Sequence, residues 1–455
     1  MQLFRAGIFH TPENPLHLDI GDRRALICHE DGGLLVHEGR VVACGEYAGI
    51  RDANPHAATV DWRGGFIVPG FVDAHVHFPQ TRIIGAMGRT LLDWLDAVAL
   101  PEEARMADRE YAAATAALFL RALASHGTTT ALVFGAHFAD ATAELFEAAD
   151  ASGLRVVSGL VLSDRLLRPD LHVTPRNAYR ESAMLIERYH RRGRLLYAVT
   201  PRFAYSTTES MLEVCQQLML EHPDVLLQTH INESTAELGE LKRLFPWAAD
   251  YLAIYERYAL SGERSVLAHN VHVTPSELER LATTGTAVAH CPGSNAALGS
   301  GCFPLRRHVD AGVTCALGTD VGGGLGFGML KEGLHAYLMQ RLAPDPNVLD
   351  AARLLYLTTR AGAEALGLEK DIGDFQPGKA ADFVHLRPPP GSVLDAAVSH
   401  AGDPAQALAA LFTLAGSESV CEVRVEGDIV FAAEEPGRCA PATRHADAGG
   451  SRDGI

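Results

Sequence analysis

The sequence of 455 residues contains only four lysines, no C-x-x-C pair and no long apolar run. Its formal net charge of −17 at pH 7 does not suit a nucleic-acid partner, because binding a phosphate backbone requires Lys and Arg gathered on one face. No uninterrupted apolar stretch approaches the ~20 residues that a membrane-spanning helix requires, and the N-terminal segment lacks the apolar core of a signal peptide. We therefore expect a cytoplasmic protein with neither a nucleic-acid nor a membrane partner.

The composition and the cysteines narrow the class further. Hydrophobic residues make up 47% of the chain and charged residues 21%, a balance typical of a globular protein. The eight cysteines are scattered, which predicts reduced thiols and no structural zinc ribbon.

Short apolar runs alternate with helix-like stretches between about residues 69 and 320, and we expect the domain that they form to span residues 69–375. The runs are GFIVPGFVDAHVH, TTTALVFGA, LRVVSGLVL, LLYAVTPRF, VLLQTHI, SVLAHNV, TAVAHCP and VTCALGTD. Helices are expected between them, for example over YAAATAALFLRALASHG and PSELERLATTG. Eight such βα units predict an α/β fold with a TIM-type (β/α)8 barrel, whose reactive groups lie at the carboxyl ends of the strands.

The flanks of this region have a different pattern. Residues 1–68 and 376–433 contain alternating short strands and turns, such as LLVHEGRVVACGE and CEVRVEGDIVFAA, which predict antiparallel hairpins. Neither flank buries enough surface alone, so we expect the two to combine into one small β-sandwich domain. Residues 434–455 are small, polar and glycine-rich, and we expect a flexible tail there.

Histidines and a carboxylate end several of the apolar runs. His75 and His77 are two residues apart in a strand, so their side chains face the same space at the barrel mouth. The runs VLLQTH, SVLAH and VTCALGTD end at His230, His269 and Asp320. Imidazoles and a carboxylate that converge there suit Zn²⁺ or Fe²⁺ with a position left open for water.

The scarcity of lysine bears on the number of metals. Barrel hydrolases with two metals commonly bridge them with a modified lysine from the fourth strand, but the fourth-strand candidate LLYAVTPRF contains none. A single metal is therefore expected, which would lower the pKa of its bound water from ~15.7 towards ~7.

Glu233 follows the fifth run in the segment THINE. A carboxylate just past the strand end could take a proton from the water and pass it to a substrate nitrogen. It could equally be an N-terminal residue of the following helix, where the helix dipole favours a carboxylate.

Taken together, PGFVDAHVH, THINE, AHNVH, AHCPGSN, ALGTD and FQPGKAADFV resemble the amidohydrolase superfamily, specifically its single-metal deaminase branch. Within that branch HFPQ, LLDWLDAVALPEEAR, VTPRFA and QTHINES are similar to the guanine deaminases. The resemblance covers roughly residues 1–433.

The resemblance implies a metal site and a proton shuttle. The implied metal ligands are His75, His77, His230 and Asp320. It further implies that Glu233 moves protons, that His269 orients the metal-bound water, and that Asp320 hydrogen-bonds the nucleophile. One Zn²⁺ per subunit, with Fe²⁺ as the alternative, and a homodimer are also implied. Whether His269 binds the metal directly is left open.

The implied reaction is hydrolytic deamination of guanine to xanthine and ammonia in purine catabolism. Gln80, Arg202 and Phe203 match the positions that hold the ring, and an amide, a guanidinium and a phenyl face can hydrogen-bond to and stack on a purine. The implied substrate contacts are His77, Gln80, Arg202, Phe203, His230, Glu233 and Asp320. The chain departs from the family at Gly293, where a hydroxyl residue is common, and at residues 205–208, and both departures bear on the pocket wall.

Three other hypotheses fit parts of the pattern. A related amidohydrolase could act on another purine, a pyrimidine or a triazine ring, although HFPQ and VTPRF argue against it. A metal-free binding protein on the same barrel is disfavoured, because every ligand position is filled. The unrelated zinc deaminase fold requires H-x-E and P-C-x-x-C signatures, which do not occur at usable spacing.

Overall fold

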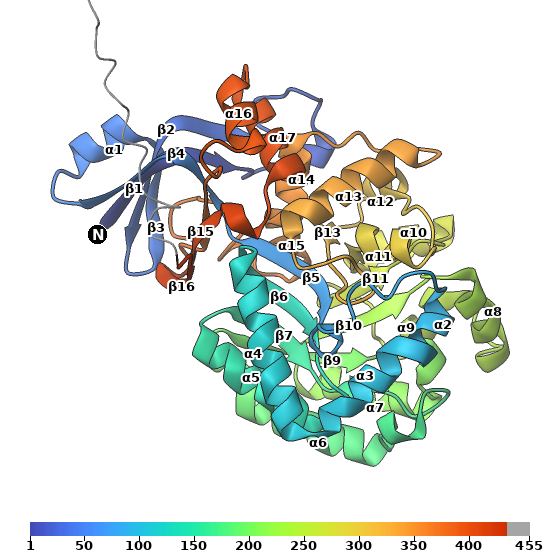
Figure 1. Cartoon of the computed structure of the whole chain (residues 1–455). Coiled ribbons are helices and arrows are strands. Elements are labelled where there is room, and N and C mark those ends of the chain that lie inside the picture. The colour runs from blue at the N-terminus through green and yellow to red at the C-terminus, as the bar shows by residue number, and fades with distance from the viewer. Residues whose placement is uncertain (435–455) are drawn as a thin grey trace, which may run out of the picture.

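The computed structural model describes residues 1–434, and the rest of the predicted tail lies outside the described residues. Eight parallel strands form a barrel with helices around it (Figure 1). In order around the sheet they are β5 (Phe71–His77), β6 (Thr128–Phe134), β7 (Arg155–Gly159), β9 (Leu195–Pro201), β10 (Leu226–Ile231), β11 (Ser265–His269), β12 (Ala287–His290) and β13 (Cys315–Leu317), with the short β8 (Val161–Leu162) pairing to the end of β9. The predicted barrel is confirmed, and each of the eight apolar runs supplies one of its strands.

The first and last strands of the barrel meet at a seam. Just beyond β13, the amide of Asp320 donates to the carbonyl of His75 at 2.8 Å, and the amide of His77 donates to the carbonyl of Val321 at 3.0 Å. The approach is close because residue 318 is glycine: a β-carbon there would lie 2.7 Å from Cβ of His75. The seam therefore sets Asp320 beside the histidines of β5.

Helices follow the strands and cover the barrel. They are α4 (Arg109–Ser125), α5 (Ala139–Ser152), α6 (Pro175–Tyr189), α7 (Glu209–Glu221), α8 (Thr235–Leu244), α9 (Tyr251–Arg257), α10 (Pro275–Thr284), α11 (Pro292–Ala297), α12 (Leu305–Ala311), α13 (Met329–Leu342), α14 (Ala351–Thr358) and α15 (Arg360–Ala365). Both helices named from the sequence, α4 and α10, are confirmed. The start of α10 shows why: Thr274 and Glu277 form a capping box, and the helix ends at Gly285 with φ +70°.

A helical segment between β5 and α4 was not predicted from the sequence. It consists of α2 (Leu91–Trp94), a π-helical turn (Leu95–Ala99) and α3 (Leu100–Ala104). Its apolar side chains pack against Phe203, which follows β9, and against Leu298, which follows α11. The segment therefore covers the carboxyl ends of the strands.

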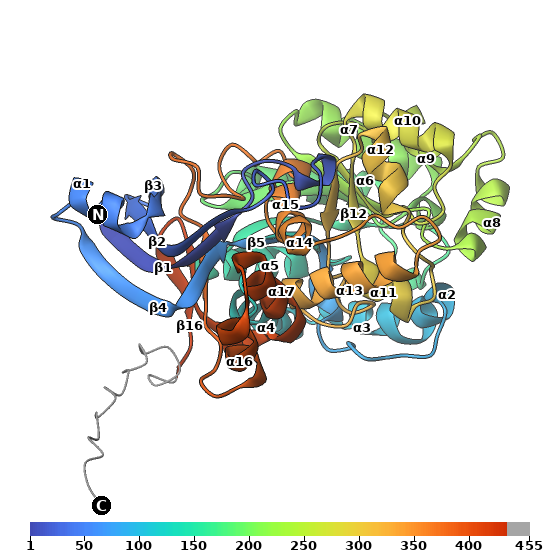
Figure 2. The ribbon, with the colours of Figure 1, turned by 90° about the horizontal axis from the view of Figure 1, so that it is seen from above.

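The two chain ends form one β domain beside the barrel (Figure 2). Its mixed sheet runs in the order β16 (Asp428–Ala432), β15 (Val420–Val425), β14 (Phe383–Leu386), β4 (Ala58–Pro69), β1 (Gln2–His10), β2 (Ile27–His37) and β3 (Arg40–Glu46). Only β1 and β4 pair in parallel, and the predicted hairpins are β2–β3 and β15–β16. One face encloses an apolar core around Phe4, Leu34 and Phe383, and the other packs on α1 (Tyr47–Ala53). The prediction that both ends build one β domain is confirmed.

The flank at 376–433 contains helices besides the strands and turns expected there. This stretch also contains α16 (Val393–His400) and α17 (Pro404–Leu414). Asp403 caps α17 and Pro404 opens it, a strong helix start. Phe412 of α17 lies so close to α13 that a β-carbon on Gly333 would be 2.7 Å from its ring. The C-terminal flank is thus shared between the β domain and the helical layer of the barrel.

One cysteine also departs from expectation. Cys421 is disulfide-bonded, whereas the remaining described cysteines are free, because scattered spacing does not report which thiols meet in the fold. Among the described residues, no helix is both long and apolar enough to cross a membrane.

Candidate active site

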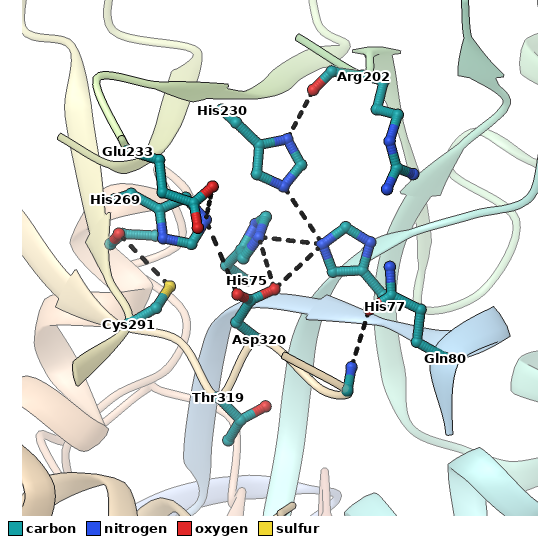
Figure 3. Close-up of polar contacts among 12 residues, drawn as sticks. His75, His77, Gln80, Arg202, His230, Glu233, His269, Cys291, Thr319 and Asp320 are labelled. Carbon is teal, nitrogen blue, oxygen red and sulfur yellow. Dashed lines mark hydrogen bonds and ion pairs between the residues drawn. The ribbon is translucent and has the colours of Figure 1, made fainter. Parts of the chain in front are cut away.

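Four histidines and one aspartate converge at the carboxyl ends of the strands (Figure 3). Nε2 of His77 lies 3.2 Å from Nε2 of His75, 3.3 Å from Nε2 of His230 and 3.2 Å from Oδ1 of Asp320. His269 joins them, because its ligand atom lies within 4.8 Å of those of His75, His230 and Asp320. All five residues are buried. The four ligands implied by the resemblance therefore meet in one place, with His269 beside them.

Outer hydrogen bonds orient the imidazoles. Nδ1 of His230 donates to the carbonyl of Arg202 at 2.6 Å, and Nδ1 of His269 donates to Oδ1 of Asn295 at 3.0 Å. An imidazole that donates from Nδ1 can turn the lone pair of Nε2 towards the centre. Burial lowers the pKa of His75 to about 4, so this ring is neutral at neutral pH, the form that binds metal. Nitrogen and carboxylate donors packed this closely fit a Zn²⁺ or Fe²⁺ ion.

Asp320 is held in a strained backbone conformation. Its φ is +48° and that of His269 is +74°, a region that residues other than glycine rarely adopt. Burial would raise the pKa of Asp320, but hydrogen bonds from His75 and His77 outweigh it and keep that pKa well below the ordinary value. Asp320 is therefore an anion at neutral pH.

Asp73 supports this arrangement and was missed as a functional residue. Its carboxylate accepts hydrogen bonds from the amide of Thr319 at 3.0 Å, the hydroxyl of Thr319 at 2.6 Å and the amide of His75 at 3.2 Å. It therefore ties β5 to the residue before Asp320. A carboxylate inside the apolar strand PGFVDAHVH was the available signal.

Glu233 points at the cluster rather than serving the helix that follows. Ser234 is the N-cap of α8, so Glu233 precedes the helix. Its Oε2 lies 3.5 Å from Nε2 of His269, and its Oε1 accepts a hydrogen bond from Ser300 at 3.4 Å. Burial raises the pKa of Glu233 to about 7. Such a carboxyl group can both release and take up a proton near neutral pH.

A pocket opens beside the cluster. Its lining includes every substrate contact implied by the resemblance: His77, Gln80, Arg202, Phe203, His230, Glu233 and Asp320. The remaining wall is mostly apolar and comes from Leu91, Trp94, Leu95 and Leu298. The segment α2–α3 thus supplies a large part of a pocket that suits a flat ring with polar edges.

Glu103 of α3 connects two of the lining residues and was also missed. Its oxygens accept hydrogen bonds from Nη1 of Arg202 at 2.9 and 2.8 Å and from Nε2 of Gln80 at 2.7 Å. Nε2 of His137 lies 3.2 Å away. Two adjacent glutamates after the apolar stretch LLDWLDAVAL were the available signal, since a buried carboxylate needs partners.

The departures from the family pattern lie away from the described pocket lining. A β-carbon on Gly293 would meet Oε2 of Glu332 at 2.8 Å, so glycine here accommodates that carboxylate. Residues 205–208 do not line the pocket either.

Burial raises the pKa of the Cys291 thiol well above its ordinary value, which argues against a thiolate nucleophile. His290 stacks on Phe303 with ring centroids 4.2 Å apart, which is consistent with a supporting rather than a catalytic residue.

Comparison with known proteins agrees with this geometry. Residues 66–430 match the amidohydrolase family. The chain is 53% identical over 440 residues to a probable guanine deaminase of Deinococcus radiodurans, covering 95% of this chain and 99% of the relative. It is 40% identical over 425 residues to the guanine deaminase of Escherichia coli, covering 93% and 95%. A solved structure of the Escherichia coli guanine deaminase superposes with a TM-score of 0.90 over 95% of this chain and 100% of that one, at 37% identity. The chain therefore belongs to the amidohydrolase family.

Proposed function

We propose that this chain catalyses the hydrolytic deamination of guanine to xanthine and ammonia, as a step of purine catabolism. The observation that carries the proposal is one pocket that joins Gln80, Arg202 and Phe203 to the histidine–aspartate cluster and Glu233. The similarity to proteins named guanine deaminases supports it.

The residues proposed to hold a metal are His75, His77, His230 and Asp320, with His269 adjacent. We propose one Zn²⁺ per subunit, with Fe²⁺ as the alternative, and the absence of lysine from β9 favours a single ion. When bound, such an ion lowers the pKa of a coordinated water and so provides hydroxide at neutral pH.

The pocket would hold guanine by its polar edge and its face. Arg202 and Gln80 present hydrogen-bond donors, and the Gln80 amide also presents an acceptor. The Phe203 ring can pack on the base, and the apolar wall from α2 excludes water. The amino-bearing carbon C2 would then face the cluster.

Glu233 and Asp320 would move the protons. Glu233 passes a proton to the ring nitrogen next to C2 as the water oxygen adds there. A second proton transfer, shared with Asp320, converts the amino group into ammonia, and the ring leaves as xanthine. The pKa of about 7 lets Glu233 act in both directions without a change in pH.

Loss of guanine and appearance of xanthine and ammonia test the proposal, with purified protein whose metal content is measured. Glu233→Gln should abolish most turnover at unchanged metal content. Glu240→Gln is the matched control, because Glu240 lies on α8, the helix that follows Glu233, and its side chain is 44% exposed. This variant should keep turnover. If metal-loaded protein does not convert guanine, the substrate assignment fails, and adenine, cytosine, pterin and triazine rings would be assayed next.

The homodimer and the cytoplasmic location implied by the resemblance are part of the same proposal. Light scattering of the purified chain and fractionation of the source cells test them.

A further inference from the structure

Glu103 is a buried carboxylate to which the proposed reaction assigns no role. Only 3% of the residue is exposed. It lies on α3, the last part of the helical segment that covers the pocket, and it holds Arg202 and Gln80 together through three hydrogen bonds. Figure 3 shows Arg202 and Gln80 on the His77 side of the cluster, where a bound ring would lie.

These contacts fix what Gln80 and Arg202 offer to a ligand. An ionised carboxylate only accepts hydrogen bonds and the amide of Gly322 only donates, so Gln80 turns Nε2 to Glu103 and Oε1 to Gly322, at 2.7 and 2.9 Å. One amide hydrogen and one oxygen lone pair remain. Arg202 uses Nη1 for Glu103, and within residues 1–434 no hydrogen bond occupies its Nε or Nη2. Those donors remain available to a ligand.

Glu103 also balances the charge that Arg202 brings to the pocket. Burial would raise its pKa, but the charge of Arg202 and the hydrogen bond from His137 outweigh burial and hold that pKa below its ordinary value. Burial lowers the pKa of His137, so its ring is neutral at neutral pH. The guanidinium is permanently charged. Glu103 and Arg202 therefore cancel, and without the carboxylate the pocket would present an unbalanced buried cation.

We propose that Glu103 is a positioning residue that makes the pocket select neutral oxopurines over anionic ones. The inference rests on the proposed function, because it requires Arg202 and Gln80 to contact the ring. Guanine is neutral at neutral pH, whereas xanthine, and urate more so, loses a ring proton readily. An unpaired Arg202 would attract such anions. Its pairing with Glu103 removes that attraction and so limits inhibition by the product.

The test compares inhibition of the metal-loaded enzyme by urate, an anion, and by hypoxanthine, a neutral oxopurine without an amino group. Glu103→Gln keeps the shape but removes the charge. We expect the ratio of the inhibition constant of hypoxanthine to that of urate to rise on the order of ten- to hundredfold. The reason is that an unbalanced charge a few ångströms from the ligand acts strongly in a buried site. The KM for guanine should rise more than kcat falls.

Glu102→Gln is the matched control. Glu102 is the adjacent residue and 7% exposed, but its carboxylate bonds to Tyr111 and Arg105 rather than to the pocket. It should keep the wild-type preference between the two inhibitors. An unchanged preference in Glu103→Gln would overturn the inference even if turnover falls, because a merely structural residue would weaken both ligands alike.

Failure of the proposed function is distinguishable. If the wild type does not deaminate guanine, calorimetric binding of urate and hypoxanthine to the wild type and both variants decides the charge inference without turnover. A shift towards urate in Glu103→Gln alone supports it, and equal shifts, or no binding of either ligand to the wild type, refute it.

Discussion

Replacing Gly318 with alanine tests how the barrel seam positions the carboxylate of Asp320. A β-carbon there would lie 2.7 Å from Cβ and 2.8 Å from the backbone nitrogen of His75, and a backbone atom cannot rotate away. β13 must therefore move from β5, which lengthens the 2.8 Å hydrogen bond between the Asp320 amide and the His75 carbonyl. Overpacking of this kind costs about 1–3 kcal/mol of the free energy of unfolding.

The assay measures the apparent Tm, the metal bound per chain and guanine turnover. We expect Gly318→Ala to lower all three, and turnover most, because a misplacement of ~1 Å in a site can cost on the order of a hundredfold. Gly239→Ala is the matched control, since no atom lies within 4 Å of a β-carbon at that position on α8 and alanine is the better helix former. A Gly318→Ala protein with wild-type metal content and turnover would refute the reasoning about the seam.

Three further predictions follow from the same contacts. Asn295→Ala removes the hydrogen-bond partner of Nδ1 of His269 and should weaken metal binding or activity roughly 10- to 100-fold, measured by competition with a chelator and by turnover; undiminished affinity and activity would contradict it. Thr319→Val preserves shape but removes the 2.6 Å hydrogen bond to buried Asp73, and should lower the free energy of unfolding by about 1–3 kcal/mol in thermal or denaturant unfolding; an unchanged Tm would show that the bond contributes nothing net. Because the pKa of Glu233 is raised to about 7, the folded metal-free protein holds a proton that the unfolded chain releases, so this group's contribution to stability falls as the pH rises from about 4.5 to about 7. Glu233→Gln lacks this titrating group, so the Tm of the variant minus the Tm of the wild type should increase as the pH rises from about 4.5 to about 7. A Tm difference that stays constant over this pH range would count against the raised pKa.

The barrel and the histidine–aspartate cluster were predictable because each depends on local signals in the sequence. A buried parallel strand is a short apolar run, and the residues at or just past its carboxyl end lie at the barrel mouth, so position in the sequence marked His230, His269 and Asp320 as candidates. The substrate-contact residues were implied by the resemblance and lie together in the structure. Their roles stay predictions.

The residues that were missed depend on contacts between distant segments. Glu103 lies in a helical segment outside the regular βα repeat and contacts Arg202, which is 99 positions further along the chain. Asp73 meets Thr319 across 246 positions. The helices α16 and α17 were not named from the sequence, although Ser392 and Asp403 cap their N-termini and Pro404 opens α17.

The seam explains why these long-range contacts matter for chemistry. His75 and His77 come from the first barrel strand and Asp320 follows the last, so these three proposed metal ligands come together only where the barrel closes. The backbone bonds across the seam, the carboxylate of Asp73 and the missing side chain at Gly318 all act at this junction. The unfavourable φ of Asp320 is tolerated because several of these contacts hold it at once. Closure of the barrel therefore also places the carboxylate of Asp320. A substitution that disturbs one of the two is expected to disturb the other.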